Sequence, residues 1–336
     1  MTDQEPGPGP GAGNSSFKLA AWTPKLLPAV VRFWNRAFSA KHNFFPVTEK
    51  LFRERVLNAE AFDSRHFVVA LDGAEVVGML HAAVRREDAC RALDGDWPGG
   101  SQGYVAFLYV EPAHRRKGVG DALWHRAIER LKATRQVTLD GQCLNPFYGN
   151  SEGPFTPFWG TPEGVSVDWD DSPTKKWLAR KGFAPRFKGV QLGIEVGPGP
   201  AAEEVGKALK RQRTDLRFLQ GQMPELGRPA MARRAIRPGL DFECAQAVRG
   251  GRTVGMIAAY PLREIRPDLW AIYEAAVVEE QRGKALGRRL LEAALARIRA
   301  RGGTRCEVLT LPDLSPGTYK RYTAAGFTPV RKWAIY

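Results

Sequence analysis

The sequence predicts a mixed α/β protein of two domains, each a β-sheet flanked by helices. Three observations lead to this expectation. A stretch rich in Pro and Gly interrupts the chain beyond its middle, motifs before the stretch recur in the same order after it, and strand-like and helix-like segments alternate in both halves. A chain of 336 residues is long enough for two domains that each bury a core.

The interruption spans residues 196–202, which read Val-Gly-Pro-Gly-Pro-Ala-Ala. Pro lacks the backbone N–H that a helix or a ladder needs, so neither element is expected to continue through this stretch. We therefore expect an N-terminal domain at 17–195, a Pro/Gly linker at 196–202 and a C-terminal domain at 203–336. Residues 1–16 are rich in Gly, Pro and Ser and are expected to form a disordered tail.

Three short features recur in the same order on the two sides of the linker. A Val-Gly-Met segment occurs at 77–80 and again at 254–257. A glycine loop that begins with Arg occurs at 115–120 and 282–287, and a Gly-Phe dipeptide occurs at 182–183 and 326–327. One shared dipeptide would carry little weight, but three features in a conserved order indicate an internal duplication.

Hydrophobic periodicity places strands and one central helix in each half. In the first half we expect strands at 66–71, 75–84, 104–110 and 135–139, and a helix at 121–133. In the second half we expect strands at 242–248, 253–261, 270–278 and 305–311, and a helix at 285–301. A helix that follows a central strand directly is the common element of both halves.

The composition narrows the class of protein. The chain has no run of 18 uncharged apolar residues and no basic, apolar leader at its start, so we expect a cytoplasmic protein with no membrane association. Four cysteines are far apart and form no CxxC pair, which argues against a disulfide framework or a zinc site. They are Cys90, Cys143, Cys244 and Cys306.

The net charge of +14 is concentrated in the second half, because residues 197–336 hold 25 of the 50 Lys and Arg but 14 of the 36 Asp and Glu. Such an excess is typical of proteins that bind an anion, and a coding bias toward Arg would produce it as well. No motif that reads nucleic acid accompanies the charge, so nucleic acid is not an expected partner.

The first half contains a strand, a short basic loop and a helix in direct succession. A helix N-terminus presents unpaired backbone N–H groups and the positive end of the helix dipole, and glycines let an anion approach these amides. The loop is therefore suited to hold a diphosphate. It lacks the GxxxxGK[ST] of a Walker loop, and Leu123 stands where a Rossmann fingerprint needs its third glycine. The candidate phosphate-binding residues are Val110, Arg115, Arg116, Lys117, Gly118, Val119 and Gly120.

This strand, loop and helix resemble motif A of the GNAT superfamily of N-acetyltransferases, in which [QR]-x-x-G-x-[GA] grips the pyrophosphate of acetyl-CoA. The first copy fits in full. In the second copy Glu279 replaces the Pro and Ala285 replaces the first Gly. The arrangement is similar to that of tandem GNAT enzymes such as mycothiol synthase. The resemblance implies a second set of cofactor-binding residues, namely Val277, Arg282, Gly283, Lys284, Ala285 and Gly287.

The resemblance implies two GNAT-like domains, each with a mixed, partly splayed β-sheet flanked by helices. It also implies transfer of an acetyl group from acetyl-CoA, as co-substrate, to a primary amine of a small molecule or peptide, with no metal. The alternative is a catalytically weak or inactive CoA-binding tandem protein that acts as a sensor or scaffold. The sequence does not define the amine, the active half, the oligomeric state or the physiological acyl group.

Two residues of the second half are the candidate catalytic groups that the resemblance suggests. Tyr322 stands four residues before the Gly-Phe dipeptide, where family enzymes offer a tyrosine that reprotonates the CoA thiolate, whereas the first half has Leu178 there. Glu274, on the strand before the second loop, is the candidate general base. Glu307 is the second choice, and Asp140 lies on the corresponding strand of the first half.

The first half also carries an additional aromatic-rich segment between residues 143 and 175. So many aromatic side chains are too apolar for a solvated linker, and the segment is expected either to form a lid over a substrate or to pack over a domain interface. Acidic residues follow the aromatics and would attract a cationic amine. They are Asp168, Asp170 and Asp171.

Overall fold

The computed structural model describes residues 17–40, 44, 46–59, 61–93, 95–139, 166–222, 226, 241, 243–263 and 266–336. These residues divide into two compact units. Unit 1 contains the chain up to Ala40 and from Val47 to Thr138, and unit 2 contains nearly all of the rest, from Leu139 to Tyr336.

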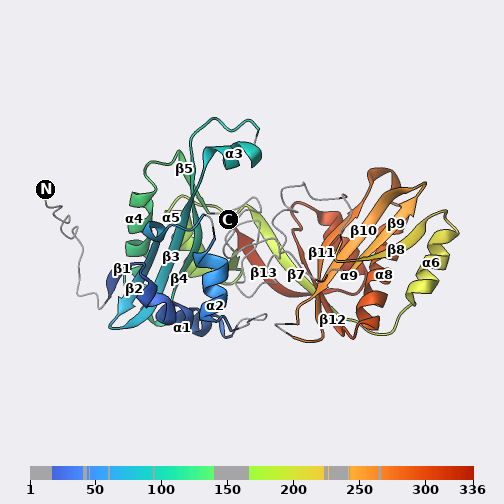
Figure 1. Cartoon of the computed structure of the whole chain (residues 1–336), viewed down its shortest axis with the longest axis horizontal. Helices are drawn as coiled ribbons and strands as arrows, with labels where there is room; N and C mark the ends of the chain where they lie inside the picture. Colours follow the sequence, from blue (N-terminus) through green and yellow to red (C-terminus); the bar gives the residue numbers. More distant parts are fainter. Residues whose placement is uncertain are drawn as a thin grey trace. The chain divides into compact units, whose positions relative to one another are not determined.

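Unit 1 contains a sheet with the strand order β1-β2-β3-β4-β5 (Figure 1). Its elements run in chain order as β1 Lys18–Ala21, α1 Leu27–Phe38, α2 Glu49–Phe52, β2 Phe67–Asp72, β3 Glu75–Arg85, α3 Glu87–Leu93, β4 Gln102–Val110, α4 Val119–Arg130 and β5 Gln136–Leu139. The first four strands are antiparallel neighbours. Successive side chains of β3 and β4 point to opposite faces of the sheet, and both faces are buried because a helix packs on each.

Helices α1 and α4 of unit 1 lie on opposite faces of its sheet. A side chain at Gly78 of β3 would meet Val119 and Leu123, so α4 covers that face. Trp34 of α1 packs against Phe107 of β4, at a ring-centroid distance of 4.8 Å, on the other face. The core of the unit is therefore divided between an aliphatic layer under α4 and an aromatic layer under α1.

Unit 2 contains a sheet with the order β6-β13-β7-β12-β11-β10-β9-β8 (Figure 1). Its elements are β6 Ser166–Asp168, α5 Ser172–Arg180, β7 Phe187–Glu195, α6 Ala202–Lys210, β8 Asp215–Gln220, β9 Glu243–Arg249, β10 Arg252–Pro261, β11 Leu269–Val277, α8 Leu286–Ala300, β12 Arg305–Thr310, α9 Pro316–Ala324 and β13 Thr328–Ile335. Helix α8 packs against β9, β10 and β11.

Strand β7 belongs to the first repeat by sequence but to the second sheet by pairing. It lies between β12 and β13 and pairs antiparallel with both. Its side chains Val190 and Leu192 are 2% and 0% exposed and join the core cluster of unit 2 under α8. The linker that we expect at 196–202 therefore separates the two repeats. The change from one sheet to the other comes earlier in the chain, between β5 and β6. The domain boundary for folding stays a prediction.

The sheet of unit 2 opens between two parallel strands. Strand β11 pairs with β12 only from Leu269 to Ile272, and residues 273–277 continue without that partner. This is the splayed geometry that we expect for the fold class, and the prediction of an α/β fold with mixed, helix-flanked sheets is confirmed. No helix in the described part of the chain is long and apolar enough to cross a membrane.

Candidate functional site

The first phosphate loop connects β4 to α4. Gly118 is the N-cap of α4 and has a φ of 83°, a left-handed conformation that glycine adopts without strain. A side chain at Gly118 would meet no described atom within 4 Å, and one at Gly120 would meet only Val110, at 3.9 Å. The space beside the first turn of α4 is therefore open, as an anion that binds to the backbone N–H groups requires.

The second loop has the same hydrogen bonds to the strand backbone as the first. Arg115 Nε donates to Val110 O at 2.9 Å in the first loop, and Arg282 Nε donates to Val277 O at 3.3 Å in the second. The residue after each valine donates its N–H to the preceding hairpin strand at 3.0 Å. The motif arginines therefore link each loop to the end of its strand. Arg116, Lys117 and Lys284 are exposed.

Each loop contains two left-handed positions, but the loops differ in which position holds glycine. In the first loop Arg116 has a φ of 61° and Gly118 has a φ of 83°. In the second loop Gly283 has a φ of 75° and Ala285 has a φ of 58°. A left-handed residue with a side chain costs about 1–2 kcal/mol. Ala285 therefore preserves the shape of the helix N-terminus at a cost in stability.

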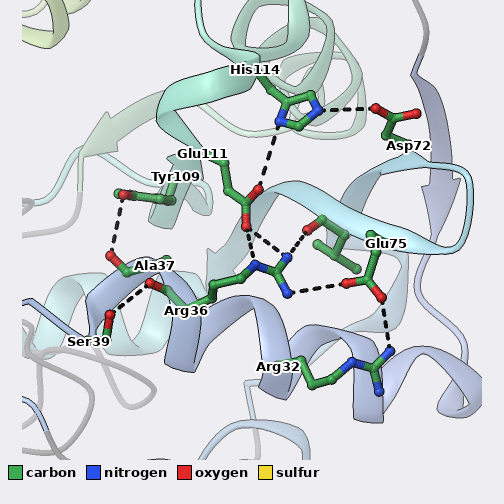
Figure 2. Close-up of polar contacts among 10 residues, drawn as sticks. Arg32, Arg36, Ala37, Ser39, Asp72, Glu75, Tyr109, Glu111 and His114 are labelled. Carbon is green, nitrogen blue, oxygen red and sulfur yellow. Dashed lines mark hydrogen bonds and ion pairs between the residues drawn. The ribbon is translucent and has the colours of Figure 1, made fainter.

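Polar side chains fix the first loop to helix α1 and to the turn between β2 and β3, as Figure 2 shows. Arg36 of α1 contacts Glu111 at 2.8 Å and Glu75 at 3.2 Å. His114 in the loop contacts Asp72 at 3.2 Å. The second loop has Val278 where the first has Glu111, so it cannot form this arginine contact.

Tyr322 of α9 lies in the core under α8, and its side chain is 3% exposed. Its ring makes an edge contact with Phe327, with centroids 5.2 Å apart. Burial raises the pKa of the Tyr322 phenol above its usual value, the charges of Cys306 and Glu274 act in the same direction, and Arg321 opposes them. The phenol is consequently protonated at neutral pH and can act as a proton donor.

A small cavity of about 10 Å³ lies beside Tyr322, at the point where β11 leaves β12. Its lining includes Ala275, Val277, Gly287 and Arg321. The cavity thus connects the end of the splayed strand, the first turn of α8 and the candidate acid.

Glu274 lies on the opposite face of the sheet from α8. Gly255 faces Leu286 and Leu290 of α8 and is paired with Val277, so Val277 shares that face. The register is regular from Val277 to Glu274, and the bulge comes earlier along β11, at Tyr273. Simple alternation therefore places Glu274 on the face away from Tyr322, although its charge still acts on the Tyr322 phenol. The candidate acid and the candidate base therefore lie on opposite faces of the sheet at strand β11.

The first half lacks both groups at the corresponding positions. Alignment of the two loops places Phe107 opposite Glu274, and strand β4 has its own bulge at Ala106, just as β11 has one at Tyr273. Phe107 packs against Trp34 and Phe38 of α1. Leu178, the counterpart of Tyr322, is buried in unit 2. The substitution at 107 was not singled out from the sequence, although the loop alignment alone reveals it.

Other predicted residues have structural partners. Glu307 is 1% exposed and accepts a hydrogen bond from Gln191 of β7. Asp168 accepts hydrogen bonds from Arg331, and Asp171 caps α5 by accepting from Thr174 N at 3.0 Å.

Some expectations fall on residues outside the described part. Asp140, Cys143 and the aromatic segment up to residue 165 lie there. The three described cysteines are buried thiols, and within the described ranges no group of three His, Cys, Asp or Glu could hold a metal.

Comparisons with known proteins agree with this geometry. A family model described as the acetyltransferase (GNAT) family matches residues 27–146 and 215–327, which together make up more than half of the chain. No curated protein matches the chain.

Similar solved structures include a GCN5-related glucosamine N-acetyltransferase region of a fungal multi-domain GH3 β-N-acetylglucosaminidase, with a TM-score of 0.62 and 15% identity over 96% of this chain and 38% of that one. A tandem GNAT protein from the clavulanic acid biosynthesis pathway has a TM-score of 0.57 and 18% identity, over 94% of this chain and 96% of that one. A GCN5-related N-acetyltransferase from Sphaerobacter thermophilus has a TM-score of 0.58 and 17% identity, over 95% and 94%.

At these identities the solved structures share the fold with this chain. The family matches fall on both repeats and include both phosphate loops, so the chain belongs to the acetyltransferase (GNAT) family, as a tandem of two GNAT-like domains.

Proposed function

We propose that this protein transfers an acetyl group from acetyl-CoA to a primary amine of a small molecule or peptide, and that the second half performs the chemistry. The observation that carries the proposal is the position of Tyr322 and Glu274 on the two sides of the splayed strand β11. The first half has Leu178 and Phe107 at these positions, and neither side chain can transfer a proton.

The two loops fit the diphosphate of acetyl-CoA, which as co-substrate would supply the acetyl group as a thioester. The open space beside Gly118 and Gly120 supports binding at the first loop, where Arg116 and Lys117 add positive charge. At the second loop a side chain at Gly283 would meet no described atom within 4 Å, one at Gly287 would meet Arg321 at 3.3 Å, and Lys284 is the corresponding cation. The motif arginines and the two valines would hold the loops in place, as their hydrogen bonds indicate.

Each catalytic side chain would have one task. Glu274 would take a proton from the attacking amine, directly or through water, on the face of the sheet away from α8. Tyr322 Oη would provide the proton that the leaving sulfur needs on the α8 face, and its raised pKa keeps that proton in place at neutral pH. Cytoplasmic location, an amine substrate and the lack of a nucleic-acid partner belong to the same proposal.

A second candidate function is that of a protein that binds CoA but does not catalyse acetyl transfer. The left-handed Ala285 and the small size of the cavity at Tyr322 favour it, since both disfavour a bound thioester in the second half. The two candidates differ in one measurement, the release of free thiol from acetyl-CoA in the presence of a panel of amines.

The decisive variant is Tyr322→Phe, because it removes the hydroxyl and keeps the ring against Phe327. Loss of a general acid typically lowers kcat by about 10²–10⁴-fold, so we expect a folded protein with kcat at least about 10²-fold lower and KM for acetyl-CoA little changed. Full activity in this variant, with loss of activity in Gly120→Glu, would place the active site in the first half. CoA binding with no turnover by the wild-type chain would support the second candidate.

A further inference from the structure

Arg321 of α9 lies beside the first turn of α8, which follows the second loop. A side chain built at Gly287, in the first turn of α8, would meet the Arg321 guanidinium at 3.3–3.4 Å. The arginine also lines the cavity beside Tyr322, but it is exposed whereas Tyr322 is buried. Its charged group therefore lies at the entrance of the cavity, over the N-terminal turn of α8.

Arg321 lies in the last turn of α9, whose dipole favours a cation, and its side chain lies beside the first turn of α8, whose dipole favours an anion. The N-terminus of a helix carries a partial positive charge, and α8 has no acidic residue in its first turn. The other cations near this end have partners, since Arg288 and Arg289 both contact Glu292. Lys284 Nζ donates to Glu280 O. Within the ranges that the structure describes, the Arg321 guanidinium makes no hydrogen bond and no ion pair.

The first half has no equivalent of this arginine. The residue before Leu178 is Trp177, which corresponds to Arg321. The first loop instead has glycine at the N-cap of its helix and a cation, Arg116, within the loop. The second loop has Ala285 at the N-cap and no arginine at the position of Arg116, so it has one fewer cation in the loop itself. An arginine from α9 restores that charge from outside the loop.

We infer that Arg321 binds the diphosphate of CoA in the second half, as a ligand supplied by α9 in addition to the loop. This inference rests on the proposed function, because it assumes that the second loop receives a CoA diphosphate. A guanidinium forms paired hydrogen bonds with phosphate oxygens, and from its position beside Gly287 it reaches the anion that the α8 amides bind. Gly287 then has two tasks, since it leaves room for both the anion and the arginine.

The test measures CoA affinity by calorimetry in the full chain with Gly120→Glu, so that binding to the first loop is suppressed. In this background Arg321→Gln is compared with Arg321→Lys and with Lys320→Gln. Lys320 is exposed on the adjacent position of α9, so its variant removes the same charge without the contact to Gly287. The probes are CoA and dephospho-CoA, which keeps the diphosphate but lacks the 3′-phosphate.

We expect Arg321→Gln to lower the affinity for both probes by about 10-fold, since a hydrogen bond to a charged group is lost at an exposed position. Arg321→Lys should recover part of this loss, Lys320→Gln should change affinity by less than about 2-fold, and added salt should reduce the difference between variants. Unchanged affinity in Arg321→Gln, an equal effect in Lys320→Gln, or an effect on CoA but not on dephospho-CoA would each overturn the inference. If the Gly120→Glu background bound no CoA at all, the second loop would not be a CoA site, and the proposed function would fail together with the inference.

Discussion

Removal of strand β7 should unfold the second unit, even though this strand comes before the linker in the sequence. The perturbation is a pair of fragments. One contains residues 203–336, which is the second repeat alone, and the other contains residues 166–336, which adds β6, α5 and β7. Strand β7 pairs with β12 and β13, so the shorter fragment has a gap in the middle of its sheet.

The expected loss is large compared with the stability of a domain. Val190 and Leu192 are almost fully buried in the core of unit 2, and burial of each such side chain contributes about 1.5–3 kcal/mol. In addition, β7 has six register pairs with β12 and seven with β13. The backbone hydrogen bonds of these two ladders contribute about 0.5–1.5 kcal/mol each. A typical domain is stable by about 5–15 kcal/mol, so the shorter fragment should not fold.

The assay is thermal unfolding followed by circular dichroism, with amide hydrogen exchange as a second measurement. We expect a cooperative transition in 166–336 and none in 203–336, with protection of β12 and β13 only in the longer fragment. A cooperative transition in 203–336 near the temperature of the longer fragment would refute this reasoning. It would mean that β12 and β13 close the gap themselves and that β7 contributes little.

Two further predictions concern single positions. Burial lowers the pKa of His81 to about 3, whereas an unfolded imidazole titrates near 6.5. The stability that the neutral ring provides is therefore fully present above pH 6.5 and is lost as the pH falls toward 3. We expect unit 1 to lose about 2 kcal/mol between pH 7 and pH 5 from this group, and His81→Leu to flatten that dependence in urea titrations, whereas an unchanged slope would assign the effect to other groups. Ala285→Gly should raise the free energy of unfolding of unit 2 by about 0.5–1 kcal/mol, because glycine relieves the strain of a left-handed alanine. Arg116→Gly should do the same in unit 1. If chemical denaturation shows that a variant is destabilised, the residue that it replaces is not strained.

Local elements could be predicted from the sequence because their signals are local. The strand expected at 75–84 is β3, Glu75–Arg85, and the helix expected at 121–133 is α4, Val119–Arg130. Alternating apolar residues and glycine turns define such elements without reference to the rest of the chain. The phosphate loops were located for the same reason, since a helix N-terminus with glycines is visible in a short stretch of sequence.

The position of β7 could not be predicted in this way. Its partners β12 and β13 lie more than a hundred residues later in the chain, and alternation of Val190, Gln191 and Leu192 shows only that the strand has two faces. The repeat itself was misleading, because it suggests that each half completes its own sheet. Within a single strand, by contrast, simple alternation places Glu274 on the face away from Val277, and the register agrees because the bulge falls before this interval.

The two halves differ in a way that would separate cofactor binding from catalysis in the mechanism that we propose. The hydrogen bonds that shape each phosphate loop involve the motif arginine, the strand end and the backbone, and none of them involves Tyr322 or Glu274. If Tyr322 and Glu274 transfer protons as we propose, a half can lack these residues and keep its loop, and the first half has Phe107 and Leu178 at these positions. In the first half, the aromatic layer around Phe107 occupies the face on which Glu274 lies in the second half. We therefore expect Phe107→Glu to destabilise unit 1 without adding activity, because the new carboxylate would be placed among aromatic rings.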